Sequence, residues 1–164
     1  MKRHLILSAL LICALMVNGQ KFSGQVYILT EHFIKDKCEV DAPCDCCAAE
    51  LIFLSKRRFS LVDRCLYHDI FLKGRYSVAN KLLTLRFKPK VVNNNYDEKK
   101  QQEFVEKKKM KMPPLVLQIN SCGSGKLVLG HSTIREYKYG SHQTQKKDTE
   151  IIKELKKSAA WKSF

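Results

Sequence analysis

Alternation of apolar and polar residues constrains the fold of this chain more than any other feature of its sequence. Leu83, Leu85 and Phe87 share one face of an extended chain. Thr84 and Arg86 lie on the opposite face. A period of two predicts strands that bury one side of a sheet, and short runs separated by turn residues predict successive antiparallel hairpins. The segments of this kind are 50–54, 59–65, 70–78, 82–87, 115–119, 126–130 and 133–139.

Glycine and polar residues mark the breaks between these segments. Gly74 lies inside the segment 70–78 and predicts a bulge or kink there. Asn80-Lys81 predicts a turn. Gly123-Ser124-Gly125-Lys126 resembles part of a phosphate-binding loop, but Leu127 replaces the Ser or Thr that would hold Mg²⁺. A hairpin turn explains these glycines better.

Two charged segments interrupt the alternating pattern. Residues 93–112 are highly charged and nearly free of aliphatic side chains, so we expect a mobile insertion with a helix around 97–109, ended by Pro113. In the tail, Ile151, Ile152, Leu155 and Ala159 recur at helical spacing. This spacing predicts a C-terminal helix over about 147–160, capped by Asp148 or Thr149 and packed on the sheet.

Seven or eight short strands and one helix predict a mainly β fold. The architecture we expect is a small antiparallel β-barrel or a strongly curved sheet with the C-terminal α-helix. Closure into a barrel would hide the strand edges that an open sheet exposes.

The first nineteen residues have the composition of a secretory signal peptide. Lys2, Arg3 and His4 precede an apolar run over 5–17, and Gly19 is suited to a cleavage site. The run is shorter than the roughly 20 apolar residues of a membrane span. We therefore expect residues 1–19 to be removed and 20–164 to form a single exported domain, in the periplasm, the outer envelope or outside the cell.

The chain is strongly basic. Its formal net charge is +14, and loss of Lys2 and Arg3 with the leader would lower the charge to +12. Such a charge favours anionic partners such as lipid headgroups or acidic glycans, and export makes nucleic acid a poor candidate. The lysines that we expect to contact an anionic surface are Lys107, Lys108, Lys109, Lys111, Lys153, Lys156 and Lys157.

Six cysteines remain after the leader, three of them within Pro43–Cys47. An even number of cysteines in an exported chain predicts disulfides, here a staple that holds a loop to the barrel. The candidates are Cys38, Cys44, Cys46, Cys47, Cys65 and Cys122. The alternatives are a redox pair at Cys44-x-x-Cys47 and a Cu(I) or Zn²⁺ site built from Cys38, Cys44, Cys46 and Cys47.

Other candidate sites are weaker. Met110-x-Met112 has the spacing of a soft copper site, but lysines surround it. The histidines have no metal or triad spacing, and no paired carboxylates or G-x-S-x-G motif is present. The sequence therefore predicts no enzyme and no obligatory cofactor.

The motifs occur in an order that resembles a known family. They are Pro43-Cys44-Asp45-Cys46-Cys47, Leu51-Ile52-Phe53-Leu54, Phe59-Ser60-Leu61, Gly74-Arg75-Tyr76-Ser77-Val78 and Leu82-Leu83-Thr84-Leu85. This order is similar to the N-terminal barrel of the NlpE copper-resistance lipoproteins and, more loosely, to small exported lipocalin-like proteins of bacteria. The resemblance covers about residues 43–87. The extra Cys46 and the Ala at position 48, where a Gly is usual, depart from the family pattern.

These observations predict an exported, non-enzymatic binding protein of the bacterial envelope, a disulfide-stapled barrel. Its partner would be a small ligand or an envelope protein, and the resemblance implies a role in envelope stress. Copper or zinc handling through Cys44 and Cys47 is one alternative. A basic adaptor for anionic lipid or glycan is the other.

Overall fold

The computed structural model describes residues 22–30, 33–34, 39–40, 49–65, 68–121, 127–130, 138–141 and 147–164. The elements, in chain order, are β1 (Val26–Thr30), β2 (Phe33–Ile34), β3 (Glu39–Val40), β4 (Ala49–Leu54), β5 (Arg58–Cys65), β6 (His68–Ala79), β7 (Leu82–Asp97), β8 (Gln102–Lys108), β9 (Leu115–Ser121), β10 (Leu127–Gly130), β11 (Lys138–Ser141), α2 (Asp148–Lys157) and α3 (Ala159–Lys162).

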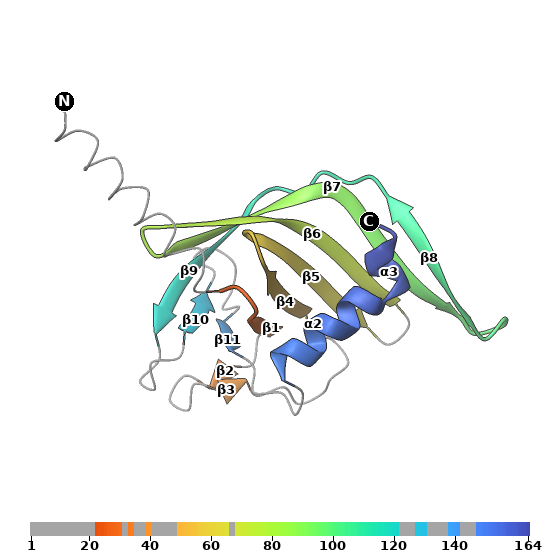
Figure 1. Ribbon diagram of the computed structural model, residues 1–164, viewed down its shortest axis with the longest axis horizontal. Helices are drawn as coiled ribbons and strands as arrows, with labels where there is room; N and C mark the ends of the chain where they lie inside the picture. The colour runs from red at the N-terminus through yellow and green to blue at the C-terminus, as the bar shows by residue number, and fades with distance from the viewer. Residues whose placement is uncertain are drawn as a thin grey trace.

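Eight strands close into an antiparallel barrel. Each strand pairs with two neighbours in the order β1-β4-β5-β6-β7-β9-β10-β11. The ring closes because β11 pairs with β1, so that Tyr27 lies opposite Ser141 and Thr30 opposite Lys138. Strands β2 and β3 form a separate pair. The predicted mainly β fold, a small antiparallel barrel with a helical C-terminus, is confirmed (Figure 1).

The two ends of the barrel differ in their connections. We call the end that carries residues 22–25, 55–57 and 80–81 the turn end. Lys56, Arg57, Asn80 and Lys81 all have positive φ there, as the two central residues of a type I′ turn require. At the other end, the loop end, β1, β5, β7 and β10 finish and the longer connections begin.

Gly74 marks an irregularity in the sheet, as its sequence context predicted. The register between β6 and β7 shifts between Leu72 and Gly74. Gly74 lies directly opposite Phe59, and a Cβ atom on Gly74 would lie 2.6 Å from the Phe59 ring and against the carbonyl oxygen of Arg86. The backbone therefore passes where a side chain has no room.

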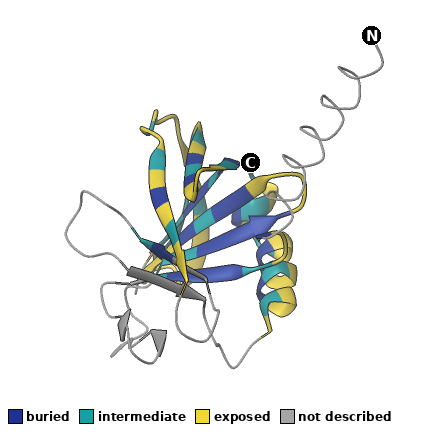
Figure 2. Ribbon diagram, turned by 90° about the vertical axis from the view of Figure 1, so that its left-hand side faces the viewer, coloured by how far each residue is buried: buried dark blue, intermediate teal, exposed yellow. Residues whose placement is uncertain are grey.

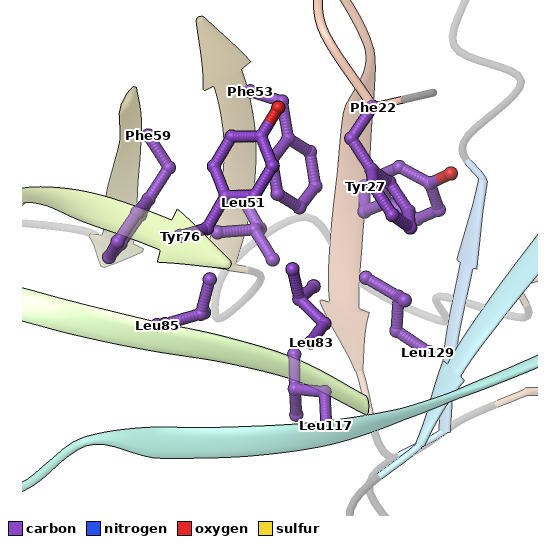
Figure 3. Close-up of a cluster of buried hydrophobic side chains, with 10 residues drawn as sticks. All are labelled: Phe22, Tyr27, Leu51, Phe53, Phe59, Tyr76, Leu83, Leu85, Leu117 and Leu129. Carbon is purple, nitrogen blue, oxygen red and sulfur yellow. The ribbon is translucent and has the colours of Figure 1, made fainter. Parts of the chain in front are cut away.

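The inside of the barrel is filled by large apolar side chains. They come from the inward positions of the alternating strands, and the rings cluster toward the turn end (Figure 3). The fully enclosed members are Phe22, Tyr27, Leu51, Phe53, Phe59, Tyr76, Leu83, Leu85, Leu117 and Leu129.

A second core lies between the outer wall of the barrel and the two C-terminal helices. Ile151 and Leu155 of α2 and Ala160 after it are buried there, while the remaining faces of α2 are exposed (Figure 2). The strand residues that they cover are Val26, Ile52, Leu54, Val62, Phe71 and Val92. The predicted packing of the tail on the sheet is thus correct.

The start of α2 differs in detail from the prediction. Lys147 occupies the N-cap position without a capping side chain. Asp148 instead accepts a hydrogen bond from the backbone N–H of Val26 over 3.2 Å, which ties the helix to β1. Ser158 ends α2, and its hydroxyl accepts from Trp161 N–H to begin α3.

The prediction of a helical insertion over 93–112 is wrong. Residues up to Asp97 continue β7, and 102–108 form β8 against it, so Asn93 lies opposite Glu106. The Asp97 carboxylate accepts from the N–H groups of Lys99 and Lys100 and so stabilises the turn. The apolar alternation is missing because this hairpin extends past the barrel core and exposes most of its residues (Figure 1).

Lys73 joins the end of the tail to the sheet. Its ammonium lies 3.1 Å from the centroid of the Trp161 ring and 4.3 Å from that of Phe164. It also donates to the Trp161 carbonyl oxygen over 3.1 Å, and Lys90 donates to the Ser163 carbonyl oxygen over 2.9 Å. Cation–π contacts and hydrogen bonds therefore hold α3 in place.

As the pH rises, Lys73 should lose its charge at a lower pH than an ordinary lysine does. Burial, and after it the nearby positive charges of Lys88, Lys90 and Arg58, together lower the pKa of Lys73 from 10.5 to about 8. Between pH 8 and 10.5 the unfolded chain still holds the proton that the folded chain has lost, so Lys73 makes the free energy of unfolding rise with pH. Trp161 is the single tryptophan, and we expect its emission to titrate with a midpoint of about 8.

Lys73→Met provides the control. The emission midpoint and the extra rise in the free energy of unfolding above pH 8 should both disappear in this variant. Burial raises the pKa of Tyr27, and this effect on the pH dependence of the free energy of unfolding is the same in both proteins. Parallel stability curves for the two proteins would contradict the prediction.

No helix among the described residues is long and apolar enough to cross a bilayer.

Candidate functional site

The interior at the turn end is an apolar plug. The Phe22 ring packs against Phe53 with centroids 5.0 Å apart and against Tyr27 at 6.0 Å (Figure 3). The backbone holds this segment in place because Gly24 N–H donates to the Phe53 carbonyl oxygen over 3.0 Å. The Tyr27 hydroxyl turns away to donate to the Gln25 side chain over 2.8 Å. Side chains therefore fill this end, and a ligand has little room there.

Toward the loop end the inner face becomes polar. Leu72 lies opposite Val91 on the inner side, and two residues further on Ile70 lies opposite Asn93. The side-chain oxygen of Asn93 is buried and has no hydrogen-bond partner among the residues that the structure describes. A buried acceptor without a partner is unfavourable by about 1–3 kcal/mol, so such a group indicates a place where something else can bind.

Asn94 offers a contrast on the other face of the same strand. Its amide nitrogen donates to Glu103 over 3.1 Å, although its oxygen is also buried without a partner. Asn94 lies opposite Asp69, on the outer side with Phe71 and Val92. Two adjacent asparagines thus point to opposite sides of one sheet.

The inner face of the β7–β8 hairpin continues this polar surface. Phe104 lies opposite Asn95 and is 42% exposed. Glu106 lies opposite Asn93 and forms an ion pair of 3.3 Å with Lys108. An exposed ring, an amide and a charged pair therefore border the inner face at the loop end.

Arg64 clamps the outer side of the same end. Its guanidinium lies 3.1 Å from Glu50 in β4 and 3.1 Å from Asp69 in β6. Burial raises the pKa of Asp69, Arg64 opposes this effect, and the nearby Glu50 adds to it. Arg64 therefore connects β4, β5 and β6 on the outer side, where Asp69 lies opposite Asn94.

The predicted cysteine site falls almost entirely outside the described residues. Cys38, Cys44, Cys46, Cys47 and Cys122 are not among them. Cys65 is the last residue of β5, at the loop end, and its backbone lies opposite His68. In the part of the chain that the structure describes, no three His, Cys, Asp or Glu residues are arranged to hold a metal ion. The disulfide staple and the metal site both stay predictions.

The predicted basic residues fall on two separate elements. Lys107, Lys108, Lys109 and Lys111 are exposed in and after β8, and Lys108 is paired with Glu106. Met110, between them, is exposed. The second set is exposed on α2 and consists of Lys153, Lys156 and Lys157. The helix also carries Asp148, Glu150 and Glu154, which offset the charge of its lysines.

Asn93 and its neighbours were missed from the sequence. The run of asparagines at 93–95 indicated a polar loop, and only the strand register reveals that alternate members face inward. Because an unpaired acceptor is a property of the folded neighbourhood, no local signal identifies it.

Comparisons with known proteins support the fold. No protein-family model and no curated protein matches the chain. Among solved structures, a streptavidin-like protein from Bacteroides eggerthii is similar, with a TM-score of 0.56, 10% sequence identity, and coverage of 85% of this chain and 90% of that chain. At this identity the similarity concerns the fold, a small curled antiparallel β-barrel.

Proposed function

We propose that this chain is an exported, non-enzymatic binding protein that holds a small molecule at the loop end of its barrel. The observation that carries the proposal is the buried side-chain oxygen of Asn93 on the inner face, which has no hydrogen-bond partner within the described part of the chain. The likeness to a streptavidin-like barrel supports it, because small barrels of eight strands are wide enough to fill with side chains or hold one small ligand.

The residues at this end define the chemistry of the ligand. Asn93 requires a hydrogen-bond donor, an N–H or an O–H group. Ile70 and Leu72 beside it, and the exposed Phe104 ring, would contact an apolar part. The ligand class is therefore a small amphipathic molecule with at least one donor group.

Asn93→Leu tests the site. We expect this variant to lose at least about tenfold in affinity, because one buried hydrogen bond is lost, while the free energy of unfolding stays equal or rises because a buried unpartnered acceptor is removed. The probe is a small-molecule library screened by thermal shift on the unmodified protein. Affinities of its hits are then measured by calorimetry.

Asn94→Leu is the matched control, since it removes the same group from the outer face. Hits should bind this variant as they bind the unmodified protein. Equal losses in the two variants, or equal binding to all three proteins, would place the ligand elsewhere and overturn the proposal.

Export and cysteine stapling form the second part of the proposal. The connection between β1 and β4 carries four cysteines, and Cys65 ends β5 at the same end of the barrel. Ser121, just before Cys122, lies at the opposite end. A disulfide spans at most about 7 Å between Cα atoms. We therefore infer that Cys65 bonds to a cysteine of the segment 38–47.

Intact mass with and without alkylation checks this inference. We expect a mature chain beginning near residue 20, few free thiols without reduction, and a peptide that joins Cys65 to the segment 38–47. Four or more free thiols with about one equivalent of copper or zinc would favour the alternative that the NlpE-like motif implies, metal handling through Cys44 and Cys47. A peptide that joins Cys65 to Cys122 would contradict the pairing.

A further inference from the structure

Three arginines lie side by side on the outer wall of the barrel, away from the proposed ligand site. Arg58 in β5 lies directly opposite Arg75 in β6, and Arg75 lies directly opposite Arg86 in β7. Their neighbours Phe59 and Leu85 are in the inner core, so the arginines share the outer face. With strands about 4.8 Å apart, this arginine row is about 10 Å long.

The arginine row has no acidic neighbour in the sequence around it. Residues 55–60 and 72–92 contain nine Lys and Arg residues and no Asp or Glu. Arg86 donates to the Ser77 hydroxyl over 3.1 Å, which is a neutral acceptor. The ion pairs between described residues use other basic groups: Arg64, Lys100 and Lys108.

This arrangement is unfavourable for the isolated fold. Like charges directly opposite on neighbouring strands destabilise a sheet, and the row has two such pairs. Next to the row, the pKa of Lys73 is lowered by burial first and then by Lys88, Lys90 and Arg58. Among the described residues no ion pair neutralises these three arginines, so an anion lying over the face would relieve the repulsion.

We propose that the arginine row binds a linear sulfated polysaccharide. Guanidinium groups bind tetrahedral oxyanions through paired hydrogen bonds, which an ammonium does not provide. A row with the regular spacing of strands suits a chain with repeated anionic groups. Leu54, which lies opposite Arg58 on β4, and Ser60, two residues further along β5, are buried and so cannot enter a bilayer.

An anionic bilayer is the competing partner. Exposed apolar residues do occur nearer the turn end, at Leu82 and Val116. The experiment must therefore measure a polysaccharide and a membrane side by side.

The test compares two variants that lose the same charge. The row variant carries Arg58→Gln, Arg75→Gln and Arg86→Gln, and the control carries Lys153→Gln, Lys156→Gln and Lys157→Gln on α2. With dextran sulfate as the probe, the row variant should bind about tenfold more weakly or worse, and its slope of log Kd against log salt should fall by about two. The helix control should change the Kd by less than about threefold.

Two further measurements complete the test. The midpoint of thermal unfolding of the row variant should rise at low salt, because the repulsion is gone. Arg75→Gln alone serves if the triple variant does not fold. Replacing all three arginines by lysine should still weaken binding several-fold, because paired hydrogen bonds are lost.

Three outcomes would overturn the proposal. The first is an equal loss of affinity in the row variant and the helix control, which would show an effect of net charge alone. The second is tighter binding to phosphatidylglycerol vesicles than to dextran sulfate. The third is tighter binding to single-stranded DNA.

Discussion

Gly74→Ala is expected to lower the free energy of unfolding by about 3 kcal/mol or more. The new methyl group would meet the carbonyl oxygen of Arg86 and lie 2.6 and 2.7 Å from two atoms of the Phe59 ring. The ring could rotate, but the carbonyl belongs to the backbone of β7 and can move only with its strand. Urea denaturation followed by far-ultraviolet circular dichroism measures the loss.

Gly130→Ala is the matched control, because Gly130 also lies in a strand of the barrel. A Cβ atom there would find the Asn120 side chain at 3.6 Å, an ordinary contact, so the change should stay within about 1 kcal/mol. Adding Phe59→Leu to Gly74→Ala should restore only part of the loss, since the backbone contact remains. Similar effects of the two glycine substitutions would show that the close approach at Gly74 is unimportant.

Phe53→Ala is expected to have a comparable effect, a loss of about 4 kcal/mol in the free energy of unfolding. Phe53 is fully buried, and its ring centroid lies 4.9 Å from that of Tyr76, 5.0 Å from Phe22 and 5.6 Å from Tyr27. Removing the ring leaves a cavity that three rigid rings cannot close. The total stability of such a domain is about 5–15 kcal/mol, so a loss of this size can unfold the alanine variant. Phe53→Leu keeps more of the side-chain volume and should show a smaller loss that can still be measured.

The control for Phe53 is Phe104→Ala in β8, on the inner face of the β7–β8 hairpin beyond the barrel core. Phe104 is 42% exposed, and its loss should lower the free energy of unfolding by less than about 1 kcal/mol. Guanidinium denaturation of both variants decides the matter. Equal losses of unfolding free energy in Phe53→Ala and Phe104→Ala would mean that the packed rings around Phe53 do not stabilise the barrel more than a half-exposed ring does.

The barrel core could be predicted because its signal is local. Leu83 and Leu85 alternate with polar neighbours and face inward, and Gly74 causes the irregularity that its position suggested. The hairpin of 91–108 could not be predicted in this way. Its strands leave the core, so pairing with the neighbouring strand rather than an apolar face decides its structure.

The candidate sites depend on register, which no single segment determines. Arg58, Arg75 and Arg86 are far apart in sequence and form a row only because three strands align them. Asn93 faces inward only because Val91 lies opposite Leu72. The cysteines and the lysine-rich segments could be named from the sequence, because their chemistry depends on residue type and spacing alone.

The pairing of β1 with β11 has a consequence for how this protein is made. Strands from the two ends of the chain order close the barrel, so β1 and β11 can pair only after nearly every other strand has been synthesised and has paired. Until then two bare strand edges stay available to neighbouring molecules, which is the condition under which β-rich chains aggregate. The yield of folded protein should therefore depend on low protein concentration or on chaperones until β1 and β11 have paired.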